Sequence, residues 1–475
     1  MTTTFSVRPH VRDVTAHLGR AWDATGELLA RLASHRQRVA LDSAAGAPRR
    51  TSLIAFDPLE SIPLPRTIAE LRTSVSALEL AHHDVPGPFA SGFLGALSYD
   101  LGVPGEASLT LPRDAWRSPH VLGGVYVDFL VIDHDARRTY LVLGEGRADD
   151  ARPALAERRA RLLEELACPA PRASVEPLGE LVRHTTPAEH RRRIEEARAQ
   201  IAAGDYYQAN LAHRFTRRVL GSAVDLYRSL RAINPAPYMA FVEDGPWALC
   251  SASPELLLES DGHRARTRPI KGTAARPAAP ELDPEADRRA ARALLASEKD
   301  RAELAMIVDL ERNDLGRVAR PGSVCVEAFP RLETYATVHH LVADVACTLR
   351  EGVDAVDALG AMFPGGSITG APKLASMRAI AALEREGRGF FTGSAGFLDV
   401  RGHAAFNILI RTLVRRADAN AGPREAGEVT YHVGGGITWS SDAAAEDQET
   451  LAKGAALAAA LEQDAAQRGA EVLSS

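Results

Sequence analysis

The pattern of apolar and polar positions in the first third of the chain alternates between helix-like and strand-like stretches. Apolar residues at helical spacing predict helices over residues 20–33 and 152–167. We expect an N-terminal region over residues 1–167 and a proline-bearing linker over residues 168–185. Short apolar runs predict strands over residues 39–43, 52–56, 91–100 (punctuated by glycine and interpreted as a pair of strands), 120–133 and 139–143.

A clear helix start opens the second part of the chain. Thr186 is a favourable N-cap, Pro187 suits the first turn, and Glu189 is placed to complete a capping box. The helix is expected to stop at Gly204. We expect a second region over residues 186–455, followed by an alanine-rich helix and tail over residues 456–475. Within it the pattern predicts a long helix from about residue 287 to 315, helices over 353–362 and 371–386, and strands over 205–211, 238–242, 247–251, 324–329 and 393–413.

Two strand-like segments, residues 253–258 and 268–273, flank an Asp261-Gly262 turn signal. Their pattern predicts a β-hairpin closed by a primed turn. A strict hairpin about this turn places Arg268 opposite Glu255. Lys271 then follows three residues later, past Pro269, which cannot continue a hydrogen-bonded ladder and is expected to bend the chain.

Lysine is scarce in this chain, because Lys and Arg together number 56 and only four of these residues are lysine. A lysine can lose its proton when desolvated and act as a nucleophile, which an arginine cannot do. Chance survival of surface lysines is the alternative. The functional interpretation is favoured for Lys271, which precedes Gly272, a residue that lets a ligand or backbone approach closely. It is open for Lys299, Lys373 and Lys453.

Composition narrows the class of protein further. A net charge of −6 argues against nucleic-acid binding through bulk charge, and hydrophobic content of 45% fits a globular protein. No apolar run reaches the length of a membrane span, and the N-terminus lacks the apolar segment of a signal peptide. The four cysteines form neither a metal-ligand spacing nor a disulfide framework. We expect a reduced, cytoplasmic protein.

Acidic residues on two predicted helices are candidate metal ligands. Glu303 lies on the long helix, and Glu446 and Glu449 lie on the last one, three residues apart and therefore on one helix face. Carboxylates from two helices suit Mg²⁺, which takes its remaining ligands from substrate and water. Ordinary surface acids are the more common explanation of such a pattern.

Other residues are candidates for binding an anion or for acid–base chemistry. Glycine clusters at residues 364–373 and 434–436 expose backbone N–H groups, which bind carboxylates or phosphates; a plain loop or a helix C-cap is the alternative. Arg411, in the apolar run 406–414, needs a carboxylate from the protein or from a substrate. His340 is either an acid–base group or a structural histidine. Together these features suggest an anionic small-molecule site with Mg²⁺, a nucleophilic lysine and a carboxylic acid.

Several ordered motifs resemble those of the chorismate-utilising enzymes, a family whose members aminate, hydroxylate or aromatise chorismate. These motifs are residues 268–273, 298–303 with 307–315, 338–342, 363–373, 410–412, and 434–437 through 447–450. The resemblance covers about residues 185–454 and extends more loosely to the first part through residues 41–43 and 95–100. It implies an α+β fold of two stacked antiparallel sheets surrounded by helices.

The resemblance also implies a reaction and roles for particular residues. Lysine at position 271 marks the branch of the family that aminates chorismate at C4, and Gln208 replaces the lysine base of the water-using branch. Lys271 would attack C2 while Glu255 protonates the departing C4 hydroxyl. The anthranilate-forming branch, or a non-catalytic subunit that binds chorismate or tryptophan, are the alternatives. The remaining roles are Mg²⁺ binding by Glu303 and Glu449 with Glu446 nearby, a catalytic part for His340, and substrate binding by Thr273, Gln208, Arg411, Gly393, Gly434 and Gly435.

Two further features concern substrate binding and the source of ammonia. The family commonly has a tyrosine where this chain has Phe391, so more of the binding of the enolpyruvyl carboxylate would fall on Arg411 and backbone amides. None of the four cysteines lies in the nucleophile elbow of a glutaminase. Ammonia would therefore come from a separate glutamine amidotransferase subunit or from solution.

Overall fold

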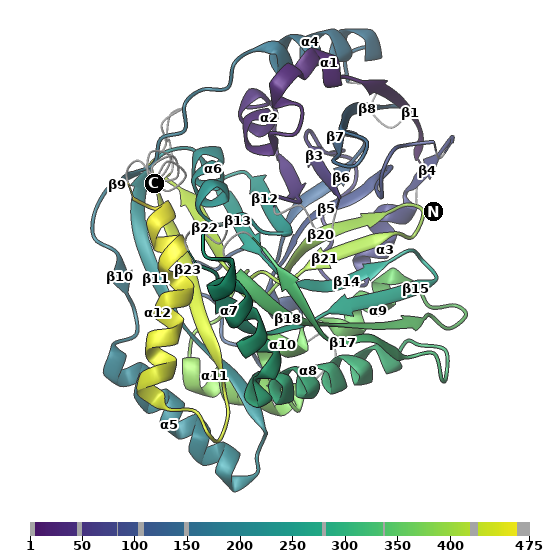
Figure 1. Cartoon of the computed structure of the whole chain (residues 1–475). Helices are drawn as coiled ribbons and strands as arrows, with labels where there is room; N and C mark the ends of the chain where they lie inside the picture. Colours follow the sequence, from purple (N-terminus) through teal and green to yellow (C-terminus); the bar gives the residue numbers. More distant parts are fainter. Residues whose placement is uncertain are drawn as a thin grey trace.

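The computed structural model of the protein describes residues 5–44, 50–82, 84–102, 109–146, 152–277, 282–335, 338–418 and 426–462. Within these residues two large sheets pack face to face, and helices cover their outer surfaces (Figure 1). Neighbouring strands are antiparallel except for one parallel pair at the edge of the larger sheet. The expected α+β class with two stacked sheets is confirmed.

The larger sheet contains strands from both sequence regions. Its strands are β1 (Phe5–Asp13), β2 (Val39–Asp42), β3 (Thr51–Ala55), β4 (Leu78–Leu80), β7 (Asp128–Asp133), β8 (Arg138–Gly146), β9 (Glu176–Pro177), β10 (Val182–Arg183), β11 (Gln208–Leu220), β12 (Tyr238–Asp244), β13 (Trp247–Ser253), β19 (Gly370–Ala371), β22 (Thr412–Ala417) and β23 (Ala426–Ile437). They follow the order β10-β11-β23-β22-β13-β12-β2-β3-β7-β8-β1-β4, with β9 and β19 beside β11.

The second sheet carries the predicted hairpin. Its strands are β5 (Gly92–Leu97), β6 (Val121–Tyr126), β14 (Leu256–Ser260), β15 (Arg264–Arg268), β16 (Ile270–Ala275), β17 (Cys325–Thr334), β18 (Val338–Thr348), β20 (Ser394–Asp399) and β21 (Ala404–Asn407). They follow the order β16-β18-β15-β14-β21-β20-β5-β6, with β17 beside β18. Pairing of β12 with β2 and of β20 with β5 joins the N-terminal region to the region after residue 186 in both sheets.

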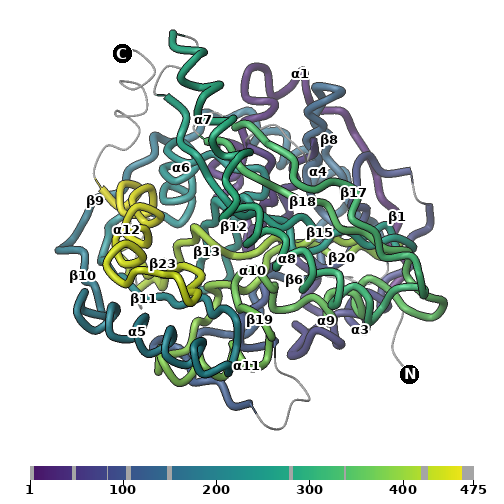
Figure 2. Tube along the Cα trace, turned by 60° about the horizontal axis from the view of Figure 1, so that its bottom comes forward, coloured from purple at the N-terminus to yellow at the C-terminus, as the bar shows by residue number. Residues whose placement is uncertain are grey.

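Helices pack on the outer surfaces of both sheets, and Figures 1 and 2 show them from two directions. In chain order they are α1 (Thr15–Leu18), η1 (Gly19–Ala21), α2 (Thr25–Arg31), α3 (Glu70–Ser76), η2 (Tyr99–Gly102), α4 (Leu155–Ala167), α5 (Pro187–Ala203), α6 (Ala223–Ile233), α7 (Pro284–Ala296), α8 (Glu298–Gly316), α9 (Ala355–Met362), α10 (Gly366–Thr369), α11 (Lys373–Glu384) and α12 (Ala443–Ala460). Among the described residues, none of the helices combines the length and apolar character that crossing a membrane requires.

The central strands bury both of their faces, which explains their nearly continuous apolar runs. Along β7, Phe129 and Val131 pack into the core between the sheets, whereas Leu130 and Ile132 pack into the core under α2, α4 and α6. This alternation follows from the two-residue period of a strand. A third core packs the second sheet against α3, α8, α9 and α11.

The local helix signals predict α5 correctly but miss the start of α8. The Thr186 hydroxyl caps α5 by accepting the Glu189 N–H at 3.2 Å, and Gly204 ends the helix in the left-handed region. The Glu189 carboxylate, however, accepts from Arg193 at 2.6 Å. The single long helix predicted to residue 315 is wrong, because Ser297 ends α7 and caps α8 by accepting the Asp300 N–H.

The hairpin exists, but its register differs from the strict one. Arg268 pairs with Leu256 instead of Glu255, because the turn is wider and a bulge lies between Leu256 and Glu259. Pro269 does not bend the strand: β15 and β16 keep one register against β18 across it, with Thr267 opposite Val345 and Ile270 opposite Val342. The register shifts only after Ile270.

One other prediction is wrong, and one helix was not predicted. Residues 91–100 form one strand and a 3-10 turn, not two strands. The capped helix α6 was not predicted, although Ser222 and Asp225 form a complete capping box. The predicted tail beyond Glu462 lies outside the described residues.

Candidate active site

A cavity of about 720 Å³ lies where β16, β18 and β23 meet α8, α10 and α12. We call it the central cavity. Nine residues singled out from the sequence line it, namely Glu255, Lys271, Thr273, Glu303, His340, Arg411, Gly434, Glu446 and Glu449. The lysine scarcity proves informative, because Lys299 and Lys453 line the same cavity as Lys271.

Lys271 enters the central cavity from a bulge in β16. The register against β18 shifts between Ile270 and Thr273, and Gly272 has a φ of 87°, which favours glycine. A Cβ at Gly272 would lie 2.9 Å from the side chain of Asp300, so glycine also allows α8 to approach. Burial lowers the pKa of Lys271; Lys453 adds to this effect, while Glu303, Glu255 and Glu449 oppose it.

Glu255 lies between β13 and β14 with an exposed fraction of 4%. Its Oε1 accepts the backbone N–H of Ile270 at 3.4 Å. Burial raises the pKa of Glu255 to about 7, while the Ser367 hydroxyl, Lys271 and the Ile270 N–H favour the charged form. A carboxyl group with this pKa holds a proton that it can donate near neutral pH.

His340 is a hydrogen-bonding group in this environment. It is 2% exposed on β18, and its Nδ1 lies 2.9 Å from Oγ1 of Thr273. Burial and the charge of Arg411 lower the pKa of His340 to about 4, although contact with the Gly272 backbone opposes this. The imidazole is therefore neutral at pH 7.

Arg411 does not lie in a buried strand. It occupies a bend before β22 with a φ of 52°, and it is half-buried in the wall of the central cavity. Burial lowers the pKa of Arg411. Among the described residues no carboxylate pairs with its guanidinium, so the structure leaves this donor group for an anion in the cavity.

The three candidate metal ligands face the central cavity from α8 and α12. Glu303 lies 3.9 Å from Nζ of Lys299, and Glu449 lies 2.8 Å from Nζ of Lys453. Glu446 is 9% exposed and accepts from Ser441 at 2.7 Å. Burial raises the pKa of Glu446. At Glu449 burial also acts to raise the pKa, but Lys453, Lys299 and Lys271 together outweigh it, so the pKa of Glu449 is lowered.

These carboxylates offer oxygen donors but do not converge on one point. Within the described residues, three potential ligand atoms come within 4.8 Å of one another only at a buried cluster of His190, His213 and Asp447. None of these three residues lines the central cavity, and Arg183 and Arg191 already pair with the Asp447 carboxylate. The donor set of Glu303, Glu446 and Glu449 fits an ion such as Mg²⁺, which completes its coordination with substrate and water.

The glycines of residues 434–436 lie inside β23 and not after it. Gly434 and Gly436 line the central cavity, whereas Gly435 does not. A Cβ at Gly435 would lie 3.2 Å from Oε2 of Glu446, and one at Gly436 would lie 2.9 Å from the amide of Gln208. The absence of side chains here therefore makes room for functional groups from α12 and β11.

Besides Gly435, two other predicted binding residues do not line the central cavity. Gly393 donates its N–H to the Phe390 carbonyl at 3.0 Å, so this amide is already occupied. Gln208 is fully buried, and neither of its side-chain amide atoms has a hydrogen-bond partner among the described residues. It lies against Gly436, directly behind the cavity wall.

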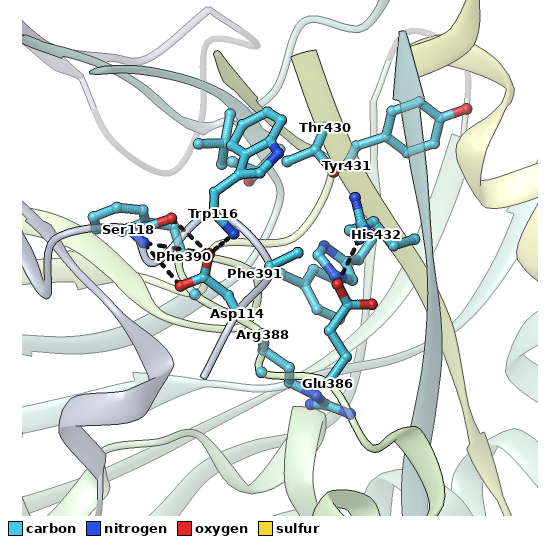
Figure 3. A pocket seen from close by; sticks show the side chains of 16 residues that line it. Asp114, Trp116, Ser118, Glu386, Arg388, Phe390, Phe391, Thr430, Tyr431 and His432 are labelled. Atoms are coloured by element: carbon cyan, nitrogen blue, oxygen red, sulfur yellow. Dashed lines mark hydrogen bonds and ion pairs between the residues drawn. The ribbon is translucent and has the colours of Figure 1, made fainter. Parts of the chain in front are cut away.

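A second, small hollow of about 20 Å³ lies behind this wall (Figure 3). Phe391 and His432 line both spaces and stack on each other, with ring centroids 5.1 Å apart. Asp114 on the far side accepts from the N–H groups of Trp116 and Ser118 (Figure 3). Phe391, at the position where the family commonly has tyrosine, thus serves as an apolar partition. Sequence reasoning missed His432, together with Asn210 and Ser367, which also line the central cavity.

Known proteins resemble this chain along most of its length. Residues 35–459 match the family described as chorismate binding enzyme. Anthranilate synthase component 1 of Streptomyces coelicolor is 39% identical over 440 residues, covering 88% of this chain and 82% of the relative. Aminodeoxychorismate synthase component 1 of Bacillus subtilis is 34% identical over 450 residues, covering 90% and 92%.

The fold is also that of a solved family member. The crystal structure of anthranilate synthase component I from Streptococcus pneumoniae superposes with a TM-score of 0.72 at 31% identity, covering 86% of this chain and 92% of that one. The chain belongs to the family of chorismate binding enzymes, and it is an enzyme that uses chorismate.

Proposed function

We propose that the protein is an aminodeoxychorismate synthase component 1, which converts chorismate and ammonia to 4-amino-4-deoxychorismate. The observation that carries this proposal is the presence of an amine with a lowered pKa, Lys271, and a carboxyl group with a pKa of about 7, Glu255, in one cavity. Relatives of both names cover most of the chain at similar identity, so the choice of reaction rests on these residues.

Lys271 acts as the nucleophile. A lysine with an ordinary pKa of about 10.4 would be neutral in only about one molecule in 2500 at pH 7. Burial of Lys271 increases this fraction, and the neutral amine attacks C2 of chorismate. Glu255 donates its proton to the C4 hydroxyl, which leaves as water. Ammonia then adds at C4, and Lys271 departs as a neutral amine.

Other groups of the cavity bind the dianionic substrate. The unpaired Arg411 guanidinium binds one carboxylate, while neutral His340 orients the Thr273 hydroxyl beside it. Glu303, Glu446 and Glu449 would hold Mg²⁺, which when bound neutralises the second carboxylate. At position 208 this chain has a glutamine, which cannot act as a base, where the water-using branch has a lysine. This difference favours ammonia as the incoming nucleophile.

Ammonia is proposed to come from a glutamine amidotransferase partner. The relatives named as component 1 are named as one part of a larger enzyme. With ammonium salts in place of the partner, this chain alone is expected to carry out the amination.

Identification of the product tests the assignment. The protein is incubated with chorismate, Mg²⁺ and ammonium, and the product is analysed by mass spectrometry and fluorescence. A product with the mass of 4-amino-4-deoxychorismate is expected. Fluorescent anthranilate, formed without a further enzyme, would instead assign the protein to the anthranilate synthases.

The variant Lys271→Ala separates an enzyme from a non-catalytic binding subunit. We expect amination to be abolished while chorismate binding, measured by calorimetry, persists, because Arg411 and the carboxylates are unchanged. Lys299→Ala is the matched control, since Lys299 lines the same cavity but is largely exposed. Unaltered amination in Lys271→Ala would contradict the covalent mechanism.

A further inference from the structure

Two acids of α8 are buried beside the central cavity, and none of the proposed catalytic steps uses them. Glu311 is 2% exposed and Asp314 is 3% exposed, and their spacing places them on one face of the helix. Oε1 of Glu311 accepts the Gly366 N–H at 3.3 Å, while its Oε2 has no hydrogen-bond partner among the described residues. Burying a polar atom without a partner costs free energy, so this arrangement calls for a functional explanation.

One end of this acidic pair reaches a second cavity. Asp314 lies 2.6 Å from Nζ of Lys373, and both residues line a cavity of about 1010 Å³ between α8, α9 and α11. We call it the outer cavity. Its lining includes the exposed residues Asn313 and Gly360, so it opens on the protein surface. The fourth lysine of the chain thus also lies at a cavity, but at the outer one.

The other end reaches the central cavity through the start of α10, which packs on α8 (Figure 1). Gly366 contacts Glu311, and the next residue, Ser367, lines the central cavity and lies beside Glu255. A Cβ at Gly366 would lie 2.5 Å from the Leu310 side chain, so glycine permits this close approach. Buried polar groups therefore form a seam from the outer cavity to Glu255. Its members are Asp314, Glu311, the Gly366-Ser367 turn and Glu255.

The proposed reaction requires one proton per turnover from outside the substrate. Glu255 loses its proton to the C4 hydroxyl, which leaves as water. Neutral ammonia forms the new C–N bond, and the product amine leaves as an ammonium group carrying all three hydrogens of that ammonia. Lys271 enters and leaves as a neutral amine. Glu255 therefore ends the cycle as a carboxylate and needs one proton before the next turnover.

We propose that Asp314 and Glu311 deliver this proton from the outer cavity to Glu255 through the Ser367 hydroxyl, while the Gly366 N–H orients the Glu311 carboxyl group. This inference rests on the proposed function. Glu311 and Asp314 do not line the central cavity, so substrate in that cavity does not cover them.

The electrostatics of the seam suit this role. Burial and the neighbouring Asp314 raise the pKa of Glu311 to about 8, while Lys373 opposes the shift and Glu255 adds to it. Glu311 thus holds a proton at neutral pH. The charged groups facing the seam are Lys373 and Arg317 at the Asp314 end and Lys271 at the Glu255 end.

The variant Glu311→Gln tests the proposal, because the amide still accepts the Gly366 N–H but cannot pass on a proton. Chorismate consumption is followed after rapid mixing with ammonium and Mg²⁺. The first turnover should keep the wild-type rate, since the fraction of Glu255 that is protonated before mixing does not depend on how fast later protons are delivered. Later turnovers should slow by about 10²-fold, the scale of proton-transfer catalysis, and show an increased solvent deuterium effect.

Two further variants complete the test. Asp314→Asn should give the same burst followed by slow turnover, and Asp309→Asn, an exposed acid on the same helix, should behave as wild type. Equal slowing of the first and later turnovers, or no slowing in Glu311→Gln, would overturn the proposal. Failure of the proposed function is separate: it would appear as a wild-type enzyme that forms a different product or consumes no chorismate.

Discussion

Asp42 and Glu255 are both buried carboxyl groups, with exposed fractions of 1% and 4%, yet the protein surrounds them differently. Asp42 accepts from Arg231 at 2.6 Å and from Tyr227 at 2.9 Å, and Thr25 and Ser52 donate to its other oxygen. Although burial opposes it, these donors lower the pKa of Asp42. Glu255 accepts one long backbone hydrogen bond at 3.4 Å, and burial raises its pKa to about 7.

The difference teaches how the two regions use a buried acid. Around Asp42, donors from α2, β3 and α6 join the N-terminal strands to the rest of the larger sheet, which stabilises the folded state. Around Glu255, too few donors are supplied to hold a permanent charge, which leaves a proton available for transfer. Substitutions at the two sites should therefore separate activity from stability.

The largest expected effect is on activity, at Glu255. Glu255→Gln should lower the rate of chorismate amination at pH 7 by about 10²–10⁴-fold, because the amide cannot donate the proton that the leaving hydroxyl needs. Initial rates by chromatography would measure it. The thermal unfolding midpoint should not fall, since the carboxyl makes few contacts. A large loss of stability would show that Glu255, like Asp42, stabilises the folded state.

The next effect is on stability, at Asp42. Asp42→Asn should lower the free energy of unfolding by about 3 kcal/mol, because it leaves the largely buried Arg231 without its partner. Urea denaturation would measure the loss. The folded variant should retain its amination rate. Loss of catalysis without loss of stability would contradict the structural role assigned to Asp42.

The two acids should have opposite effects on how the free energy of unfolding changes with pH. The folded-state pKa of Glu255, about 7, lies above its ordinary value of 4.5, so the folded protein keeps a proton that the unfolded chain releases. Wild type should therefore lose stability relative to Glu255→Gln as the pH rises from 4.5 to 7.

Asp42 should show the opposite behaviour. Its folded-state pKa lies below 3.8, so its stabilising effect is complete above that pH and is lost as the pH falls through the lower value. Unfolding midpoints of wild type and both variants across pH 3–8 would show these trends. A common pH trend for the two acids would remove the distinction.

The smallest expected effect comes from removing one donor to Asp42. Tyr227→Phe deletes the hydroxyl that donates at 2.9 Å and should cost about 1.5 kcal/mol, the scale of a hydrogen bond to a charged group. Tyr207→Phe is the matched control, because Tyr207 is 72% exposed. An equal loss in both variants would show that the Asp42 donors contribute nothing specific.

Much of the secondary structure could be predicted because its signals are local. The Thr186 cap, the end of α5 at Gly204 and the existence of the hairpin depend on residues only a few positions apart. Lysine scarcity likewise needed no structure, and it marked Lys271 together with two other residues of the same cavity. The order of motifs along the chain was enough to indicate the family.

Contacts between distant segments decided the rest. The bulge that moves Arg268 opposite Leu256 accompanies pairing of β14 with β21, about 150 residues away in sequence. The break at Ser297, the bend at Arg411 and the placement of Gly434 inside β23 likewise depend on tertiary packing.

The sequence by itself determined where many of the helices and strands form and which residue types could do chemistry here. Only the tertiary structure decided that Asp42 is saturated with donors while Glu255 is not. The physical reason is that the pKa of a buried carboxyl depends on the donors and charges within a few ångströms, and for both acids these come from other helices, strands and turns that only the fold brings together.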